Sequence, residues 1–276
     1  MDNRELKKDD YILVVDSGNG GKYTLKQLKK HMPHENFLFL EDDYNAPYGN
    51  KTTGKLKRIC KKMLLFMVKN YPIKMIIFAC NTLSTVCLAF ARNLIDYMPI
   101  IPTLPIIKTF KTNTLVLCTS VTKKYNEDVK FAQTLDNVKV EDFSDLAKKI
   151  DENMQNLSVL QPFLDKKLKK YADMDIHQVV LGCTHYNLIK KQITNAITNN
   201  PYVKPKREYE LLSTNRDSQT RVFRLKKKNI KFLEASSFVA KNSMQTLSAL
   251  SLTSNNNAQG EVRFLKTSAL NIFSHK

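Results

Sequence analysis

Short apolar runs alternate with amphipathic stretches along most of this chain, and this alternation restricts the fold more than any other feature of the sequence. The predicted strands are Tyr11–Val15, Phe37–Leu40, Met75–Phe78, Thr114–Leu117, Val138–Val140, Val179–Leu181, Ile230–Leu233 and Val262–Leu265. The predicted helices are Thr24–His31, Thr52–Asn70, Asn81–Leu94, Tyr125–Leu135, Phe143–Met154, Pro162–Ala172, Asn187–Ile197 and Ser237–Leu250. Strands that alternate with helices form largely parallel sheets, so we predict an α/β protein.

An internal similarity indicates two related halves. Residues 76–82 (IIFACNT) and 179–185 (VVLGCTH) both place three apolar residues, one small residue, a cysteine and two polar residues in the same order. The proline-rich segment Pro99–Pro105 interrupts the pattern between them and is a natural crossover. We therefore predict a first domain from residues 1–98 plus 230–276 and a second from 99–200. The polar, basic segment 201–229 is predicted to be an inserted loop or a disordered segment.

Composition excludes several classes of protein. No apolar run reaches the length of about 18 residues that a membrane helix needs. The charged stretch Met1–Asp10 lacks the apolar core of a signal peptide. The five cysteines have neither disulfide-framework nor zinc-ligand spacing, so we expect reduced thiols in a cytoplasmic protein without a metal.

The chain is strongly basic, with a formal net charge of +18. Most lysines are spread along the sequence and are expected on solvated helix faces. Residues 204–228 differ, because they concentrate basic side chains: Arg207, Arg216, Arg221, Arg224, Lys226, Lys227 and Lys228. Nucleic acid or another polyanion is therefore an alternative partner for this segment.

Polar groups follow the predicted strands at points where parallel sheets bind ligands. The strand ends supply Asp16-Ser17-Gly18, Ala79-Cys80-Asn81-Thr82, Cys118-Thr119-Ser120 and Gly182-Cys183-Thr184-His185. The turn Gly18–Gly21 matches neither a phosphate-binding loop nor a dinucleotide fingerprint. A Cys/His hydrolase built on Cys183 and His185 would leave the second, matching cysteine unexplained.

Two matched thiols suit a reaction that needs a base on one side of a carbon and an acid on the other. Removal of an α-proton by one cysteine and return of a proton by the other inverts the centre. Free thiols ionise near pH 8.5, so each needs a helper; Asp16 is a candidate for Cys80, and His185 for Cys183. The alternative interpretation is that a cysteine after a strand merely packs as a small apolar group, as we expect for Cys60 and Cys87 on helix faces.

The chain resembles the glutamate racemase family, within the wider aspartate/glutamate racemase group. The resemblance is carried, in order, by Asp16-Ser17-Gly18-Asn19-Gly20-Gly21, Pro47-Tyr48-Gly49, Ala79-Cys80-Asn81-Thr82 and Leu181-Gly182-Cys183-Thr184-His185-Tyr186. It implies two similar flavodoxin-like α/β domains, an active site in the cleft between them and no cofactor. It also implies that Cys80 and Cys183 are the paired acid and base, with Asp16, His185 and Asp151 assisting. The implied substrate-binding residues are Asp16, Ser17, Tyr48, Gly49, Asn81, Thr82, Thr119, Thr122, Thr184 and His185.

The sequence departs from the family pattern at several positions. Asp151 stands where a glutamate is usual, Asn187 where a proline is usual and Leu83 where a small residue is usual, while segment 201–229 has no recognised counterpart. The leading hypothesis is a glutamate racemase that acts in the cytoplasm on a free amino acid. A homodimer is compatible with this hypothesis, and the product would serve cell-wall synthesis. The alternatives are a racemase for aspartate or another amino acid, and a nucleic-acid-binding protein on a racemase scaffold.

Overall fold

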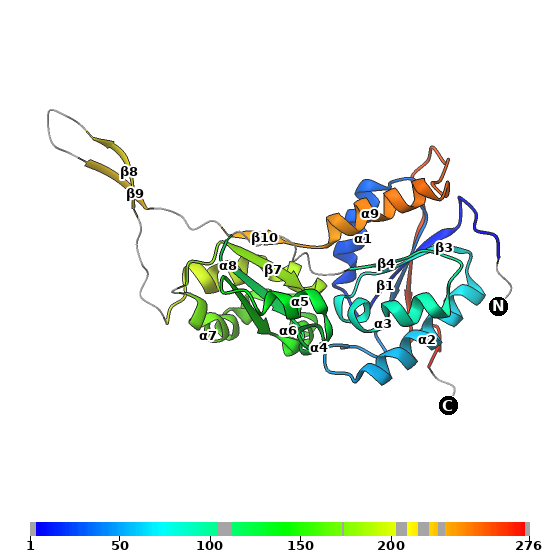
Figure 1. The fold of residues 1–276 in the computed structure, drawn as a ribbon, viewed down its shortest axis with the longest axis horizontal. Coiled ribbons are helices and arrows are strands. Elements are labelled where there is room, and N and C mark those ends of the chain that lie inside the picture. Colours follow the sequence, from blue (N-terminus) through cyan, green and yellow to red (C-terminus); the bar gives the residue numbers. More distant parts are fainter. Residues whose placement is uncertain are drawn as a thin grey trace.

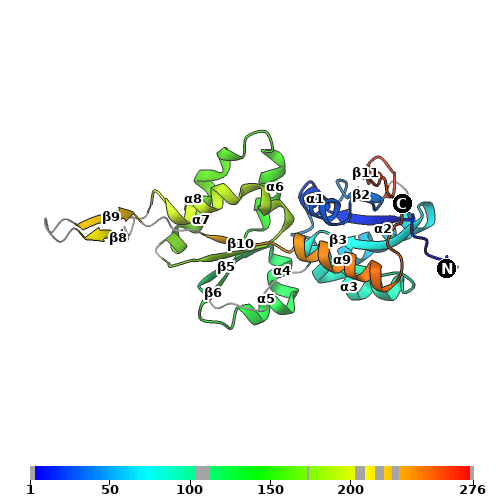
Figure 2. The same ribbon diagram turned by 90° about the horizontal axis from the view of Figure 1, so that it is seen from above.

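The computed structural model describes residues 4–103, 112–172, 174–202, 209–214, 221–225 and 230–273. Two parallel sheets lie side by side in the molecule (Figures 1 and 2). The first sheet has the strand order β11-β2-β1-β3-β4. Its strands are β1 (Tyr11–Asp16), β2 (Phe37–Glu41), β3 (Ile73–Phe78), β4 (Ile100–Pro102) and β11 (Val262–Lys266). Every residue of β1, β2 and β3 is buried, because helices cover both faces of this sheet.

Four helices surround the first sheet. Helices α1 (Gly21–His31) and α9 (Ser236–Ala249) pack on one face, where Leu25, Leu28 and Val239 meet Val14 of the sheet. Helices α2 (Thr53–Asn70) and α3 (Asn81–Leu94) pack on the other face through an apolar cluster. Helix α2 has the predicted apolar stripe, which is now seen to be fully buried: Leu56, Ile59, Cys60, Met63, Leu64 and Met67.

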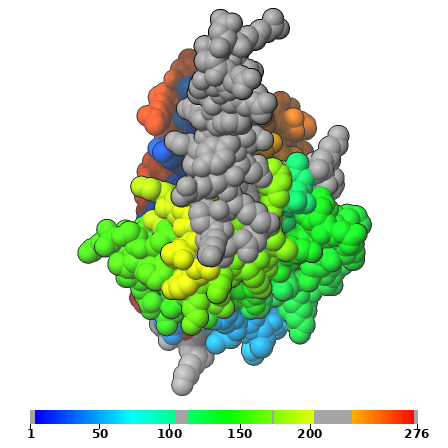
Figure 3. Space-filling model, turned by 90° about the vertical axis from the view of Figure 1, so that its left-hand side faces the viewer, coloured from blue at the N-terminus to red at the C-terminus, as the bar shows by residue number. Residues whose placement is uncertain are grey.

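The second sheet has the strand order β10-β7-β5-β6. Its strands are β5 (Thr114–Cys118), β6 (Val138–Asp142), β7 (Gln178–Gly182) and β10 (Lys231–Leu233). Helices α6 (Ser144–Glu152), α7 (Gln161–Ala172) and α8 (Lys190–Thr198) cover one face. The short helices α4 (Ser120–Tyr125) and α5 (Glu127–Ala132) lie on the other side, with α5 packed against the sheet. Figure 3 views the molecule from the side of this half, with atoms of the first half, coloured blue and orange, behind it.

The predicted α/β class is confirmed, and the differences from the sequence prediction are local. The helix predicted at Tyr125–Leu135 is replaced by α4 and α5, which meet at Asn126; the side chain of Asn126 accepts a hydrogen bond from the Val129 amide and so starts a new helix. The crossover segment Pro99–Pro105 includes β4, which is an edge strand. Pro102 lacks an amide hydrogen, which is tolerated there because no further strand pairs with the outer side of β4. Two 3₁₀ helices, Leu157–Leu160 and Thr184–Ile189, precede α7 and α8.

Two further differences concern residues after 200. The predicted first domain includes residues 230–276, but β10 pairs with β7 in the second sheet, whereas α9 and β11 pack with the first. The segment predicted as a loop or disordered contains two strands, β8 (Tyr209–Thr214) and β9 (Arg221–Leu225), which pair antiparallel and lie beyond the second sheet in Figure 1. Their side chains lie outside the description, as do residues 203–208, 215–220 and 226–229. Among the described residues, no helix has the length and apolar character needed to cross a bilayer.

Candidate active site

The carboxyl ends of the strands bring the predicted residues together. Asp16 is the last residue of β1, and Cys80 follows β3 and caps the start of α3. Cys183 follows β7 in the second sheet, at the position equivalent to Cys80. The turn after β1 approaches the segment after β7, so both strand-end cysteines lie where the two halves of the molecule meet.

Cys80 occupies a buried, negatively charged environment. Its side chain is 6% exposed, and its Sγ lies 3.7 Å from the Ser17 hydroxyl. Burial raises the pKa of the Cys80 thiol well above its ordinary value, and the nearby charges of Asp16 and Cys183 raise it further. The environment therefore favours a protonated Cys80.

Cys183 has a cationic neighbour instead. It is 9% exposed, and its Sγ lies 3.7 Å from His185 Nδ1. On the other side of the ring, His185 Nε2 lies 3.1 Å from Asp151 Oδ2, within ion-pair distance. Burial on its own would lower the pKa of His185, but the contacts with Asp151 and Cys183 raise it well above its usual value. The side chain of Cys183 therefore lies beside a histidine that is held in its cationic form.

Asp16 connects the two halves. Its side chain is fully buried; Oδ1 accepts a hydrogen bond from the Gly18 amide at 3.0 Å, and Oδ2 accepts one from the Thr184 hydroxyl at 3.2 Å. Burial raises the pKa of Asp16 to about 6, although His185 and these hydrogen bonds act in the opposite direction. A carboxyl group with that pKa exchanges protons readily near neutral pH.

The glycines of the turn after β1 permit this close approach. A Cβ atom at Gly20 would lie 2.5 Å from Thr184 Oγ1 and 2.6 Å from the His185 amide nitrogen. A Cβ atom at Gly18 would lie 2.9 Å from His185 Nε2. Any side chain at these positions would push the turn away from the segment that carries Cys183 and His185.

Hydroxyl groups from both halves complete the region. Thr82, at the start of α3, lies 3.0 Å from Thr119, measured between the Oγ1 atoms, and the Thr119 hydroxyl donates to that of Thr122 at 3.1 Å. Gly49 lies against the Thr119 side chain. The Asn81 Oδ1 atom is buried and accepts no hydrogen bond from any group in the described part of the chain. Ser17, Asn81, Thr82, Thr119 and Thr184 are all buried.

Sequence reasoning passed over Asp42, which directly follows β2. Its carboxylate accepts hydrogen bonds from the Tyr48 hydroxyl, from the Asn45 side chain and from the Thr267 hydroxyl after β11. Burial and the charge of Asp42 raise the pKa of Tyr48 well above its ordinary value. An acidic residue at a strand end was the available signal, but its partners depend on how β11 pairs with β2, which the sequence does not reveal.

The remaining cysteines have no part in this cluster. Cys60 and Cys87 are buried in the apolar core between α2 and α3, as predicted. Cys118 ends β5 and packs with Val129 and Ala132 on the face of the second sheet opposite to that of Cys183. Burial raises the pKa of Cys118 to about 12.

Comparison with known proteins extends these observations. No protein-family model matches the chain. The glutamate racemase of Clostridium acetobutylicum is 30% identical over 209 residues, which cover 71% of this chain and 79% of that protein. The glutamate racemase of Clostridium kluyveri is 32% identical over 199 residues, which cover 69% of this chain and 77% of that protein.

Solved structures share the fold. Glutamate racemase isoform RacE1 of Bacillus anthracis superposes with a TM-score of 0.72 at 21% identity and covers 97% of this chain and 92% of its own. The glutamate racemase of Francisella tularensis, solved in complex with D-glutamate, gives a TM-score of 0.72 at 22% identity and covers 94% and 89%. The fold and the sequence relatives together define an amino-acid racemase, an enzyme of the isomerase class. The chain belongs to the glutamate racemase family, which confirms the resemblance seen in the sequence.

Proposed function

We propose that this enzyme interconverts L- and D-glutamate without a cofactor, with Cys80 and Cys183 as the two acid/base groups. The observation that carries the proposal is that each sheet places one thiol after a strand where the two halves meet, with Cys80 beside Ser17 and Cys183 beside His185. Burial and the Asp16 carboxylate raise the pKa of Cys80, which favours its thiol form, and Cys183 lies beside His185, whose own pKa is raised. A reaction with two bases requires one thiolate and one thiol at the same time.

In one direction, the Cys183 thiolate takes the α-proton, and the electron pair of the broken C–H bond remains on the substrate as a carbanion. The Cys80 thiol then gives its proton to the opposite face of that carbon, which leaves a Cys80 thiolate and a Cys183 thiol. In the reverse direction the roles exchange. Asp16, with a pKa of about 6, supports proton movement at Cys80, while His185, held by Asp151, does so at Cys183.

The surrounding polar groups fit an amino acid with two carboxylates. The unpaired Asn81 Oδ1 is an acceptor suited to the substrate ammonium. The hydroxyls of Ser17, Thr82, Thr119, Thr122 and Thr184 and the backbone of the turn at Tyr48-Gly49 would hold the carboxylates. The Francisella tularensis relative was solved with D-glutamate and an Escherichia coli relative with L-glutamate, which favours glutamate over aspartate as the substrate.

Racemisation of L-glutamate, followed by circular dichroism in deuterium oxide, tests the proposal. We expect the wild-type enzyme to lose optical activity and to incorporate deuterium at the α-carbon. Cys80→Ser and Cys183→Ser should each lose at least about a hundredfold in racemisation rate. Each variant retains one thiol, so each should still exchange the α-proton of one enantiomer, and the two variants should prefer opposite enantiomers. Racemisation by either variant at the wild-type rate would contradict the mechanism, and faster turnover of aspartate than of glutamate would reassign the substrate.

A further inference from the structure

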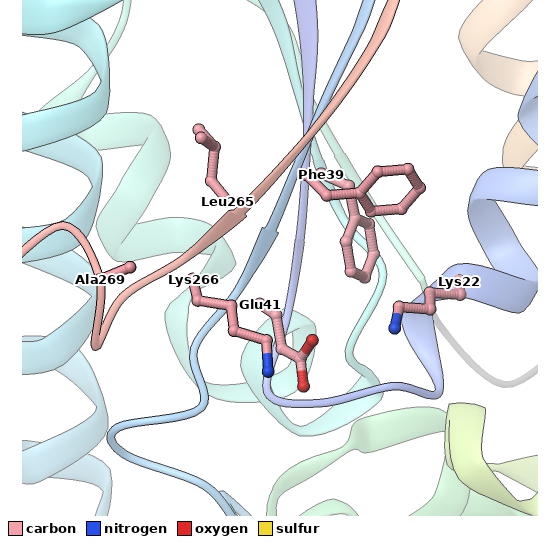
Figure 4. Close-up of a pocket in the computed structure, with 7 residues that line it drawn as sticks. Lys22, Phe39, Glu41, Leu265, Lys266 and Ala269 are labelled. Carbon is pink, nitrogen blue, oxygen red and sulfur yellow. The ribbon is translucent and has the colours of Figure 1, made fainter.

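An open groove lies at the edge of the first sheet, separate from the cysteine cluster. It has a volume of about 610 Å³ and is lined by residues of β2, β11 and the start of α1, together with Ala269 (Figure 4). Strand pairing places Asp16 beside Glu41, and Glu41 beside Lys266, across β1, β2 and β11. The groove is therefore at the same carboxyl edge of the sheet as Asp16, on the neighbouring strands.

Glu41 is the unusual residue of this groove. It is 7% exposed, yet within the described ranges its carboxylate makes neither an ion pair nor a hydrogen bond. Its carboxylate oxygens are not among the buried unpaired atoms of the described residues, so they reach the solvent of the groove. A ligand in the groove can therefore replace water as the hydrogen-bond donor to this carboxylate.

Two cations flank this carboxylate. In Figure 4, the Glu41 carboxylate lies between the side-chain nitrogens of Lys266 and Lys22. The Lys22 ammonium contacts a neutral group, the Asn19 side-chain oxygen, at 2.6 Å. Neither lysine has an acidic partner within ion-pair distance in the part of the chain that the structure describes. The groove thus presents one anionic acceptor between two cationic donors.

The adjacent wall is apolar and aromatic. The rings of Phe39 and Phe264 are 5.8 Å apart at 59°, and Phe264 is 61% exposed although it lies on a strand. An exposed aromatic ring on an edge strand offers a surface to an apolar group of a ligand. One anion, two cations and an aromatic wall together match a zwitterion that carries an apolar side chain.

We propose that this groove binds a free α-amino acid with an aromatic or branched apolar side chain. Its ammonium would pair with Glu41, its carboxylate with Lys22 and Lys266, and its side chain would pack on the exposed ring of Phe264, which lies against the buried Phe39. This ligand differs from the acidic substrate of the cysteine cluster, so the site would be additional to the racemase site. The Glu41 carbonyl also accepts a backbone hydrogen bond from Thr267, whose hydroxyl contacts Asp42, so the ligand would bind beside the segment that holds Tyr48.

Isothermal titration of the full-length enzyme with L-phenylalanine tests this assignment, with and without saturating glutamate. We expect binding that glutamate does not displace. L-Phenylalaninamide lacks the carboxylate and 3-phenylpropanoate lacks the ammonium, so each should bind at least about tenfold more weakly, the effect of one charge-assisted pair. No detectable heat with L-phenylalanine, displacement by glutamate, or equal affinity for all three compounds would overturn the proposal.

Variants of the groove test separately the residues that would bind the ammonium and the carboxylate of the ligand. Glu41→Gln should weaken L-phenylalanine binding about tenfold and leave the affinity for 3-phenylpropanoate unchanged. The matched control Glu127→Gln alters an exposed carboxylate far from the groove and should change neither affinity. Should Glu41→Gln fail to fold, Lys266→Met on the exposed edge strand serves instead and should weaken L-phenylalanine but not L-phenylalaninamide. Unchanged affinities in the folded variant would contradict the assignment.

Discussion

The Thr184 hydroxyl donates a hydrogen bond to the Asp16 carboxylate at 3.2 Å and thereby joins the segment after β7 to the end of β1. Both side chains are buried, so this contact fixes the second half of the molecule against the first, next to the segments that carry Cys80 and Cys183. The bond also lowers the pKa of Asp16 against the larger effect of burial. The contact is therefore both structural and electrostatic.

Replacement of Thr184 by valine should reveal both effects. Loss of the hydrogen bond should reduce the free energy of unfolding by about 1 kcal/mol, measured by urea denaturation. The pKa of Asp16 should rise above its present value of about 6, so the acidic limb of the racemisation pH profile should move to higher pH. Thr184→Ser keeps the hydroxyl and should retain the wild-type profile. If the pH profile of the valine variant is unchanged, ionisation of Asp16 does not determine the acidic limb.

Asp16 should make a pH-dependent contribution to stability. Its pKa in the folded protein, about 6, exceeds the ordinary value of 3.8, so the folded state holds this proton more tightly than the unfolded chain. The contribution is therefore favourable below about pH 4, falls as the pH rises to about 6, and stays low above that. The full change is roughly 3 kcal/mol. Asp16→Asn should abolish this dependence, so its stability relative to the wild type should rise between about pH 4 and pH 7 while its racemisation rate falls. If the difference in free energy of unfolding between Asp16→Asn and the wild type is constant over that range, the raised pKa of Asp16 is contradicted.

Gly20 should not tolerate a methyl group. Gly20→Ala would bring a Cβ atom within 2.6 Å of the His185 backbone, which cannot move aside as a side chain can. We expect a loss of about 2 kcal/mol in stability and at least about tenfold in kcat/KM, because the two halves must separate. Gly54 is a matched control in α2, where a Cβ atom would meet nothing within 4 Å, so Gly54→Ala should stabilise the helix by up to about 1 kcal/mol. Similar effects of the two substitutions would refute the close-approach argument.

Asp151 should set the ionisation of His185. Asp151→Asn removes the anion 3.1 Å from Nε2, so the pKa of His185 should fall, which NMR of the imidazole nitrogens would measure directly. The basic limb of the racemisation profile should move to lower pH, since His185 loses its charge at a lower pH than in the wild type. Glu152→Gln is the adjacent control, because Glu152 pairs with the exposed Lys148 at 3.6 Å and should affect neither measurement. If His185 titrates identically in both variants, Asp151 is not its partner.

The basic segment 204–228 can be tested for a separate role. If it contacts nucleic acid, fluorescence anisotropy should show binding to duplex DNA that weakens about a hundredfold or more between roughly 50 and 200 mM salt. Replacement of the segment by a short glycine-serine linker should remove the binding, whereas alanine at the exposed Lys61 and Lys62 of α2 should reduce it little. Binding that survives the replacement would eliminate this segment as the nucleic-acid contact.

The sequence predicted the parts of the fold and site that depend on local pattern. Apolar runs located β1, β3 and β7, and the parallel arrangement implied that Asp16, Cys80 and Cys183 follow the carboxyl ends of strands. Features that depend on pairing between distant segments escaped prediction. The apolar pattern predicts a strand at Ile230–Leu233, but the local sequence does not determine whether this strand pairs with β7 or with the first sheet. The link from Thr267 through Asp42 to Tyr48 likewise exists only once β11 has joined β2.

The return of the chain after β10 restricts how the enzyme can open. The backbone passes from one sheet to the other between Pro102 and Thr114, and back again through Glu234 and Ala235 alone. This second passage is short, and the ion pair of Lys190 with Glu234 at 2.7 Å anchors it to α8. A body tied at two places cannot swing freely, so relative motion of the two halves is restricted to a rotation about the line that joins the two passages. Such motion would be largest far from that line and smallest beside Glu234.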